Sequence, residues 1–137
     1  KAILFRYNEA MKTETEVRFL AEQLLADYYD CDAARLDDAA LLREAAHAAV
    51  QAVGAEVVEE CVHRFEPMGV SYIAVISTSH ISIHTWPEYG YAAVDIFSCA
   101  QGIPQEVAEA LGRALRAGKV RTHCFRRDMK GGAAIEV

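Results

Sequence analysis

The sequence predicts an α+β domain, a two-layer sandwich in which a mostly antiparallel sheet carries its helices on one face. Two observations support this prediction: segments with helical periodicity lie near the N-terminus, and β-branched segments follow as a consecutive run. The chain has 137 residues, enough for one domain with a core and too few for two comfortable ones. We therefore expect residues 1–137 to form a single domain.

Three segments are predicted to be helical. Residues 37–53 carry an apolar stripe and are followed by Gly54, and residues 104–117 begin with Pro104 and are followed by Gly118. The first segment, residues 13–29, begins with candidate threonine caps, and its apolar stripe consists of Val17, Leu20, Leu24 and Leu25.

The predicted strands are rich in β-branched residues and are separated by turn residues. They cover residues 56–65, 71–77, 79–86, 92–98 and 120–125, with 135–137 as a candidate last strand. Helices on one face would leave the other face of the sheet uncovered. If that face carries Phe65, Trp86 and Tyr91, it forms a large apolar patch. A face-to-face dimer, in an αββα arrangement, is the simplest way to cover it.

Composition excludes several classes of protein. The formal net charge of −6 argues against a nucleic-acid binder, because such proteins need a basic surface to displace counterions. No apolar run approaches the ~20 residues of a membrane-spanning helix, and the first residues lack the apolar core of a signal peptide. The four cysteines form no CxxC pair, which argues against a zinc site. Without a secretory signal, we expect reduced thiols and a cytoplasmic location.

The segment from Ser77 to Tyr91 is the most informative part of the chain. It concentrates hydroxyl, imidazole, indole and carboxylate side chains, and isoleucines alternate with the polar residues. This alternation predicts a strand with one apolar and one reactive face. Polar groups at such density are costly to place beside a core. We therefore expect the polar face to carry a function.

Two other chemistries are less compatible with this segment. His80 and His84 would share a face of a strand, but at ~3.3 Å per residue they lie roughly 13 Å apart, too far to hold one metal ion. A Ser-His hydrolase would need a nucleophile elbow, and no GxSxG motif is present. Taken singly, Phe65, Trp86 and Cys99 would each be interpreted as core residues.

The joint pattern is more specific than any single residue. Ser71, Ser79, His84, the run Trp86-Pro87-Glu88-Tyr89-Gly90-Tyr91 and Cys99 resemble, at matching spacing, the processing and catalytic segment of the prokaryotic S-adenosylmethionine decarboxylases. The resemblance covers about residues 20–127, and residues 1–16 look like an extension. It implies a cytoplasmic homodimer that decarboxylates S-adenosylmethionine to the aminopropyl donor for spermidine synthesis.

Enzymes of this family cleave their own chain and convert a serine into a pyruvoyl cofactor, which forms a Schiff base with the substrate. By resemblance, Ser79 is that serine and cleavage falls between Thr78 and Ser79. His84 matches the histidine that removes the Cα proton of the serine during processing, and Ser71 matches the serine that assists processing. Cys99 matches the residue that protonates the decarboxylated substrate. No metal is implied.

The resemblance also assigns substrate contacts. Phe65 and Trp86 match aromatic residues that sandwich the adenine, and Glu88 matches the carboxylate that holds the ribose hydroxyls. The chain departs from the family at Thr78, where a glutamate is usual. Two alternatives follow from this departure: a pyruvoyl-dependent arginine or ornithine decarboxylase, or a non-processing pseudoenzyme.

Overall fold

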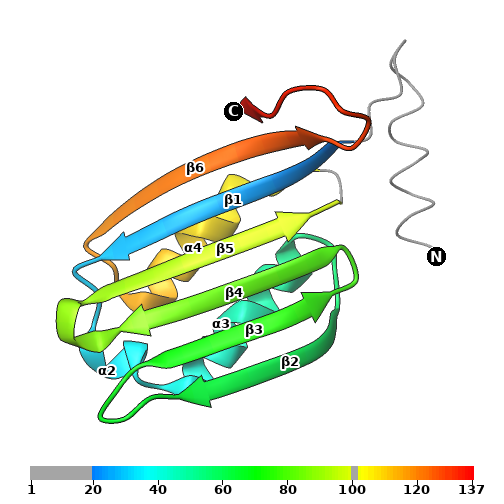
Figure 1. Ribbon diagram of the computed structural model, residues 1–137. Coiled ribbons are helices and arrows are strands. Elements are labelled where there is room, and N and C mark those ends of the chain that lie inside the picture. The colour runs from blue at the N-terminus through cyan, green and yellow to red at the C-terminus, as the bar shows by residue number, and fades with distance from the viewer. Residues whose placement is uncertain (1–19, 100–101) are drawn as a thin grey trace.

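The computed structural model describes residues 20–99 and 102–137, which form an antiparallel sheet with helices packed against one face (Figure 1). The seven strands of this part of the chain follow the order β2-β3-β4-β5-β1-β6-β7. They are β1 (Leu20–Tyr29), β2 (Val57–Arg64), β3 (Val70–Ile76), β4 (Ser79–Trp86), β5 (Tyr91–Ser98), β6 (Lys119–Asp128) and β7 (Ile135–Glu136). The helices are α2 (Ala33–Leu36), α3 (Ala39–Ala52), α4 (Gln105–Leu115) and the short 3-10 helix η2 (Pro87–Tyr89). The predicted α+β class is confirmed.

The helix predicted over residues 13–29 is wrong for residues 20–29, which form strand β1; residues 13–19 and the predicted extension 1–16 lie outside the described residues. β1 pairs with β5 on one side and β6 on the other, so it lies inside the sheet. Leu24, Ala26 and Tyr28 alternate toward the helices and are buried. Tertiary pairing here overrides the helical propensity of a segment rich in leucine and alanine.

The remaining predicted elements are confirmed, with boundaries that shift by up to about three residues. One helix, α2, was not predicted as a separate element. Asp32 caps it by accepting hydrogen bonds from the backbone N–H groups of Ala34 and Arg35, at 3.0 and 3.2 Å. Asp38 then starts α3 by accepting from the N–H of Leu41 at 3.1 Å. Two successive aspartate caps therefore start two helices: α2, which precedes the segment 37–53 predicted as a helix, and α3, which lies within that segment.

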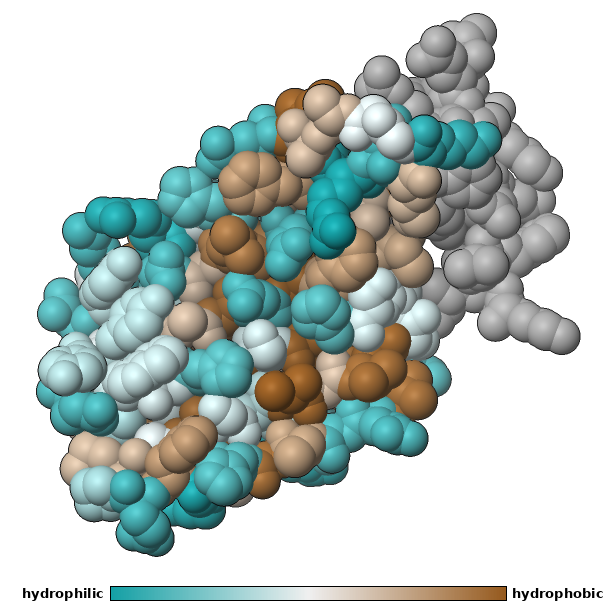
Figure 2. Space-filling view, in the orientation of Figure 1, coloured by the Kyte–Doolittle hydropathy of each residue, from teal (hydrophilic) through white to brown (hydrophobic). Residues whose placement is uncertain are grey.

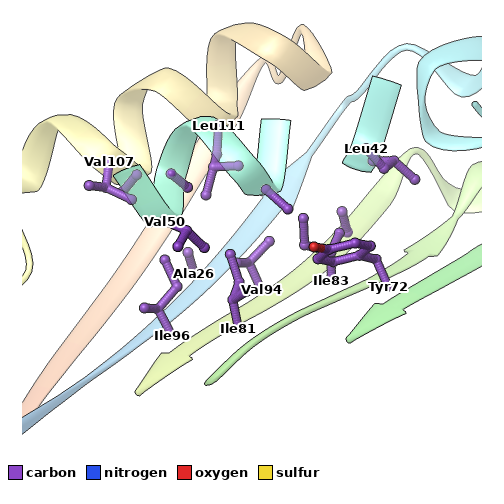
Figure 3. Close-up of a cluster of buried hydrophobic side chains, with 14 of the residues drawn as sticks. Ala26, Leu42, Val50, Tyr72, Ile81, Ile83, Val94, Ile96, Val107 and Leu111 are labelled. Carbon is purple, nitrogen blue, oxygen red and sulfur yellow. The ribbon is translucent and has the colours of Figure 1, made fainter. Parts of the chain in front are cut away.

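The core lies between the sheet and helices α3 and α4 (Figure 3). On β4, Ile81 and Ile83 are fully buried, while the residues between them face the other side of the sheet. The helices contribute Leu42 and Val50 from α3, and Val107 and Leu111 from α4. This alternation follows the period of two expected for a strand with one buried face.

The second face of the sheet is open in the described part of the chain (Figures 1 and 2). Large apolar side chains are exposed there, including Ile73 at 48%, Val75 at 52% and Trp86 at 38%. Figure 2 views this face and shows hydrophobic patches between hydrophilic residues. None of the described helices has the length and apolar character needed to cross a membrane.

Candidate active site

The turn between β3 and β4 consists of Ser77 and Thr78, and Ser77 is hydrogen-bonded to a residue outside this hairpin. The backbone N–H of Ser77 donates to the carbonyl of Glu56 at 2.8 Å. In return, the hydroxyl of Ser77 accepts from the N–H of Glu56 at 2.9 Å. This pair of bonds fixes the turn against the start of β2, so the first residue of β4, Ser79, has a defined position.

Ser79 has a backbone φ of 146°, in the region that residues other than glycine rarely adopt. Asp30 and Arg116 are the other non-glycine residues with positive φ in the described chain, and both have the more common left-handed values of 53° and 51°. With φ near 146°, tetrahedral geometry at Cα turns the Ser79 Cβ toward the carbonyl carbon of Thr78. The strained conformation therefore directs the hydroxyl-bearing carbon at the preceding peptide bond.

The carbonyl of that peptide bond is also held. The backbone N–H of Cys99 donates to the Thr78 carbonyl oxygen at 2.8 Å. The Thr78 side chain is 1% exposed, and its Oγ1 accepts a hydrogen bond from Ser98 Oγ at 3.0 Å. Ser98 and Ser79 are register partners across β4 and β5. The structure thus brings together Thr78, Ser79 and Cys99, which we call the turn cluster.

A second group of predicted residues lies at the other end of β4. Ser71 and His84 are cross-strand partners on β3 and β4, and Ser71 Oγ lies 2.6 Å from His84 Nδ1. They line a pocket of about 320 Å³. The pocket residues are Phe65, Met68, Ser71, His84, Thr85, Trp86 and Glu88. The structure thus also brings together Phe65, Ser71, His84, Trp86 and Glu88, which we call the pocket cluster.

The backbone around the pocket is fixed by two side chains that the sequence did not single out. Thr85 Oγ1 accepts from the N–H of Val70 at 2.9 Å and donates to the carbonyl of Leu36 at 2.7 Å. Asp37 accepts from the N–H of Gly69 at 2.9 Å. These bonds tie the β2–β3 turn, which carries Phe65 at its start, to helix α2. Thr85 was recognisable only as a hydroxyl on the otherwise apolar face of β4.

Trp86 is backed by a second aromatic side chain. The ring centroids of Trp86 and Tyr91 lie 5.4 Å apart, and Tyr91 in turn lies 5.4 Å from Tyr29. The hydroxyl of Tyr91 donates to Asp27. Burial, and then this carboxylate, raise the pKa of Tyr91 to about 12, so its hydroxyl remains a donor at neutral pH. The aromatic contacts hold the indole at the edge of the pocket.

The turn cluster and the pocket cluster lie at opposite ends of β4 (Figure 1). Ser79 and His84 are five residues apart on this strand. At ~3.3 Å per residue their Cα atoms are separated by roughly 17 Å. A single protomer therefore does not bring His84 within reach of Ser79, although it places each residue among other predicted site residues.

The described part of the chain contains no group of three or more His, Cys, Asp or Glu side chains arranged to hold a metal ion. The groups available for chemistry are instead a strained serine beside a polarised carbonyl, a thiol, and an imidazole paired with a hydroxyl. Such groups suit acyl transfer and proton transfer.

Comparison with known proteins agrees with these motifs. Residues 22–128 match the family model for S-adenosylmethionine decarboxylase. The chain is 42% identical over 119 residues to an S-adenosylmethionine decarboxylase proenzyme from Parasynechococcus marenigrum, covering 86% of this chain and 93% of the relative. It is 44% identical over 105 residues to the proenzyme of that name from Thermotoga petrophila, covering 76% of this chain and 81% of the relative.

A solved structure shares the fold as well. The crystal structure of the adenosylmethionine decarboxylase from Aquifex aeolicus matches with a TM-score of 0.70 and 30% sequence identity, covering 78% of this chain and 89% of that one. The family predicted from the residues between Ser71 and Cys99 is thus confirmed. The chain belongs to the S-adenosylmethionine decarboxylase proenzyme family.

Proposed function

We propose that the chain cleaves itself between Thr78 and Ser79, and that the processed dimer decarboxylates S-adenosylmethionine to an aminopropyl donor for spermidine synthesis. The observation that carries this proposal is the geometry of one peptide bond. Ser79 has a φ of 146°, which turns its Cβ toward the Thr78 carbonyl carbon, and the Cys99 N–H donates to the carbonyl oxygen at 2.8 Å.

Self-cleavage begins when Ser79 Oγ attacks the Thr78 carbonyl carbon. The C–N bond breaks, the hydroxyl proton passes to the released amine, and an ester forms. The Cys99 N–H stabilises the negative charge that develops on the carbonyl oxygen. A base then removes the Ser79 Cα proton, and the ester leaves as the carboxylate of Thr78. Hydrolysis of the remaining dehydroalanine releases ammonia and leaves a pyruvoyl group at position 79.

The surroundings of Ser79 fit a pyruvoyl cofactor made in place, since the strained residue and the held carbonyl are what its formation requires. A pyruvoyl group supplies an electron sink for the electrons left behind when carbon dioxide departs. Cys99 follows β5 and contacts the same peptide bond through its backbone. We assign to its thiol the proton that the decarboxylated substrate receives.

The pocket cluster suits a nucleoside that carries a positive charge. Phe65 and Trp86 expose 49% and 38% of their surface, which leaves aromatic faces available for an adenine. Aromatic faces also attract a sulfonium cation. Glu88, on η2, supplies carboxylate oxygens that can accept hydrogen bonds from ribose hydroxyls. These features favour S-adenosylmethionine over arginine or ornithine, which have no base to stack.

The separation of roughly 17 Å between Ser79 and His84 supports a dimer. A second copy stacked on the open face, with its β4 running in the opposite direction, would bring the turn cluster of one protomer to the pocket cluster of the other. His84 of one copy would then serve as the base for Ser79 of its partner. The exposed Ile73 and Val75 on the open face favour this face-to-face αββα arrangement.

Thr78 does not weigh against processing. Its side chain is buried and hydrogen-bonded, and its carbonyl is held by Cys99. These contacts favour a cleaved enzyme over a non-processing pseudoenzyme.

The four cysteines are free thiols, which favours the cytoplasm as the location. The pyruvoyl group is the only cofactor that we propose.

Carbon dioxide release from S-adenosylmethionine, arginine and ornithine tests the substrate. We expect release from S-adenosylmethionine alone. Trp86→Ala should lower kcat/KM at least about tenfold, because it removes one stacking face. Tyr89→Ala is the matched control, since Tyr89 is an aromatic residue of the same segment that is 77% exposed and does not line the pocket. Release from arginine with none from S-adenosylmethionine would overturn the assignment.

A further inference from the structure

The side chain of Thr78 meets a second hydroxyl inside the protein. Ser98 Oγ donates to Thr78 Oγ1 at 3.0 Å, and the two residues are 0% and 1% exposed. Burying a hydroxyl costs free energy unless the hydroxyl is hydrogen-bonded. The bond between Ser98 and Thr78 offsets this cost for both side chains. It lies directly beside the peptide bond that we propose is cleaved.

Thr78 is therefore held at two points by consecutive residues at the end of β5. Ser98 holds its side chain, and the backbone N–H of Cys99 holds its carbonyl oxygen at 2.8 Å. Ser98 is also the cross-strand partner of Ser79. It therefore lies beside both residues of the Thr78–Ser79 peptide bond. Bonds to the side chain and to the carbonyl of one residue restrict rotation of its carbonyl plane.

We propose that Ser98 is a positioning residue for self-cleavage, which acts through the hydroxyl of Thr78. Its hydrogen bond keeps the Thr78 carbonyl oxygen directed at the Cys99 N–H and the carbonyl carbon facing Ser79, which is the alignment that attack requires. The inference rests on the proposed function, because it concerns how the same peptide bond is held. It also gives the buried hydroxyl of Thr78 a role of its own.

The test follows cleavage of newly synthesised full-length chain into residues 1–78 and 79–137 on a gel over time. Ser98→Ala and Thr78→Val should each slow cleavage about fivefold to tenfold, as expected for loss of one buried hydrogen bond. The double variant should be no slower than the slower single variant, because both changes remove the same contact. Ser98→Thr keeps the hydroxyl and should cleave within about twofold of the parent.

Tyr28→Phe is the control for a general loss of stability. The Tyr28 hydroxyl is buried and donates to the carbonyl of Ala108 at 2.8 Å, far from the turn cluster in the sequence and in the sheet. This variant should cleave at the parent rate. Rates are compared at a temperature at which circular dichroism shows every variant to be folded.

The outcomes separate this inference from the proposed function. If the parent cleaves and Ser98→Ala cleaves equally fast, Ser98 has no positioning role and the proposed function stands. The same conclusion follows if Tyr28→Phe slows cleavage as much as Ser98→Ala, or if the effects of Ser98→Ala and Thr78→Val multiply in the double variant. If the parent never cleaves, both the inference and the proposed function fail.

Discussion

Ser79 adopts a backbone conformation that costs an L residue of order 1–3 kcal/mol, and the fold sustains it. The turn is anchored to Glu56, and the preceding carbonyl is anchored to Cys99, so the hairpin cannot relax without losing these bonds. The motif around Ser79 predicts that it is the processed serine. The strain was not predictable from the sequence, because it depends on contacts with β2 and β5 that form only in the folded chain.

Two different groups of Cys99 act in the proposed mechanism. Its backbone N–H contacts the Thr78 carbonyl, whereas its thiol is assigned to the later proton transfer. Cys99→Ala keeps the N–H, so chain cleavage should remain within about threefold of the parent. Turnover should fall by about a hundredfold or more, the usual contribution of a positioned acid.

Cleavage on a gel and carbon dioxide release per processed chain measure the two effects of Cys99→Ala side by side. Cys61→Ala is the matched control, since Cys61 is an exposed cysteine of β2 outside both clusters. A Cys99→Ala protein that turns over at the parent rate would remove the thiol from the mechanism.

At the scale of elements, the β3–β4–β5 region was the most predictable part of the fold and β1 the least. β4 has isoleucines that alternate with polar residues, so its period of two was visible in the sequence. β1 has the sequence LAEQLLADYY, in which strong helix formers dominate and an apolar stripe fits a helix equally well. Only its pairing with β5 and β6 decides in favour of a strand.

Helix α3 is attached to the edge of the sheet by a carboxylate. Arg43 Nε and His47 Nε2 lie 2.6 and 2.7 Å from the two oxygens of Glu60 on β2, and the Tyr72 hydroxyl donates to the same carboxylate at 2.7 Å. The hydrogen bond with His47, followed by the one with Tyr72, lowers the pKa of Glu60 from 4.5 to about 2. Protonation of Glu60 therefore weakens this attachment.

This shift predicts how acid affects the free energy of unfolding. Because the folded pKa lies below the unfolded one, the contribution of Glu60 is complete above pH 4.5 and is lost as the pH falls toward about 2. Glu60→Gln should make stability less dependent on pH in this window. Thermal unfolding of the uncleaved Ser79→Ala chain measures it, with Glu109→Gln on the exposed side of α4 as control. Equal pH dependence in Glu60→Gln and its parent would contradict the prediction.

At the scale of the whole molecule, the predicted site residues form two clusters at opposite ends of one strand. The sequence predicted the members of both clusters and predicted the dimer, but a motif gives only spacing along the chain. Where β4 runs straight, residues close in sequence are far apart in space: Ser79 and His84 are separated by roughly 17 Å. The proposed function therefore requires residues from two copies.

Mixing two inactive variants tests this requirement. Ser79→Ala removes the nucleophile and should never cleave, whereas His84→Ala should remain intact or stall as an ester that hydroxylamine splits. In a mixed dimer, one site would combine the intact Ser79 of one copy with the intact His84 of the other. Coexpression at equal levels should therefore restore about a quarter of the parent activity, because half the dimers are mixed and one of their two sites is complete.

The controls for this mixing experiment are each variant alone and a coexpression of Ser79→Ala with the double variant Ser79→Ala/His84→Ala. None of these can assemble a complete site, so none should show activity. If the two single variants, coexpressed in dimers of confirmed mixed composition, remain inactive, then the site is not shared between copies in the way we propose.

Mass spectrometry of the purified parent chain shows whether the chain cleaves itself at Ser79. We predict two fragments, residues 1–78 ending in a free carboxylate and residues 79–137 lighter by one ammonia than their sequence requires, because Ser79 has become a pyruvoyl group. The second fragment should also resist Edman degradation, since it has no amino terminus. A single intact chain after long incubation, or a fragment 79–137 that retains an amino-terminal serine, would contradict the account.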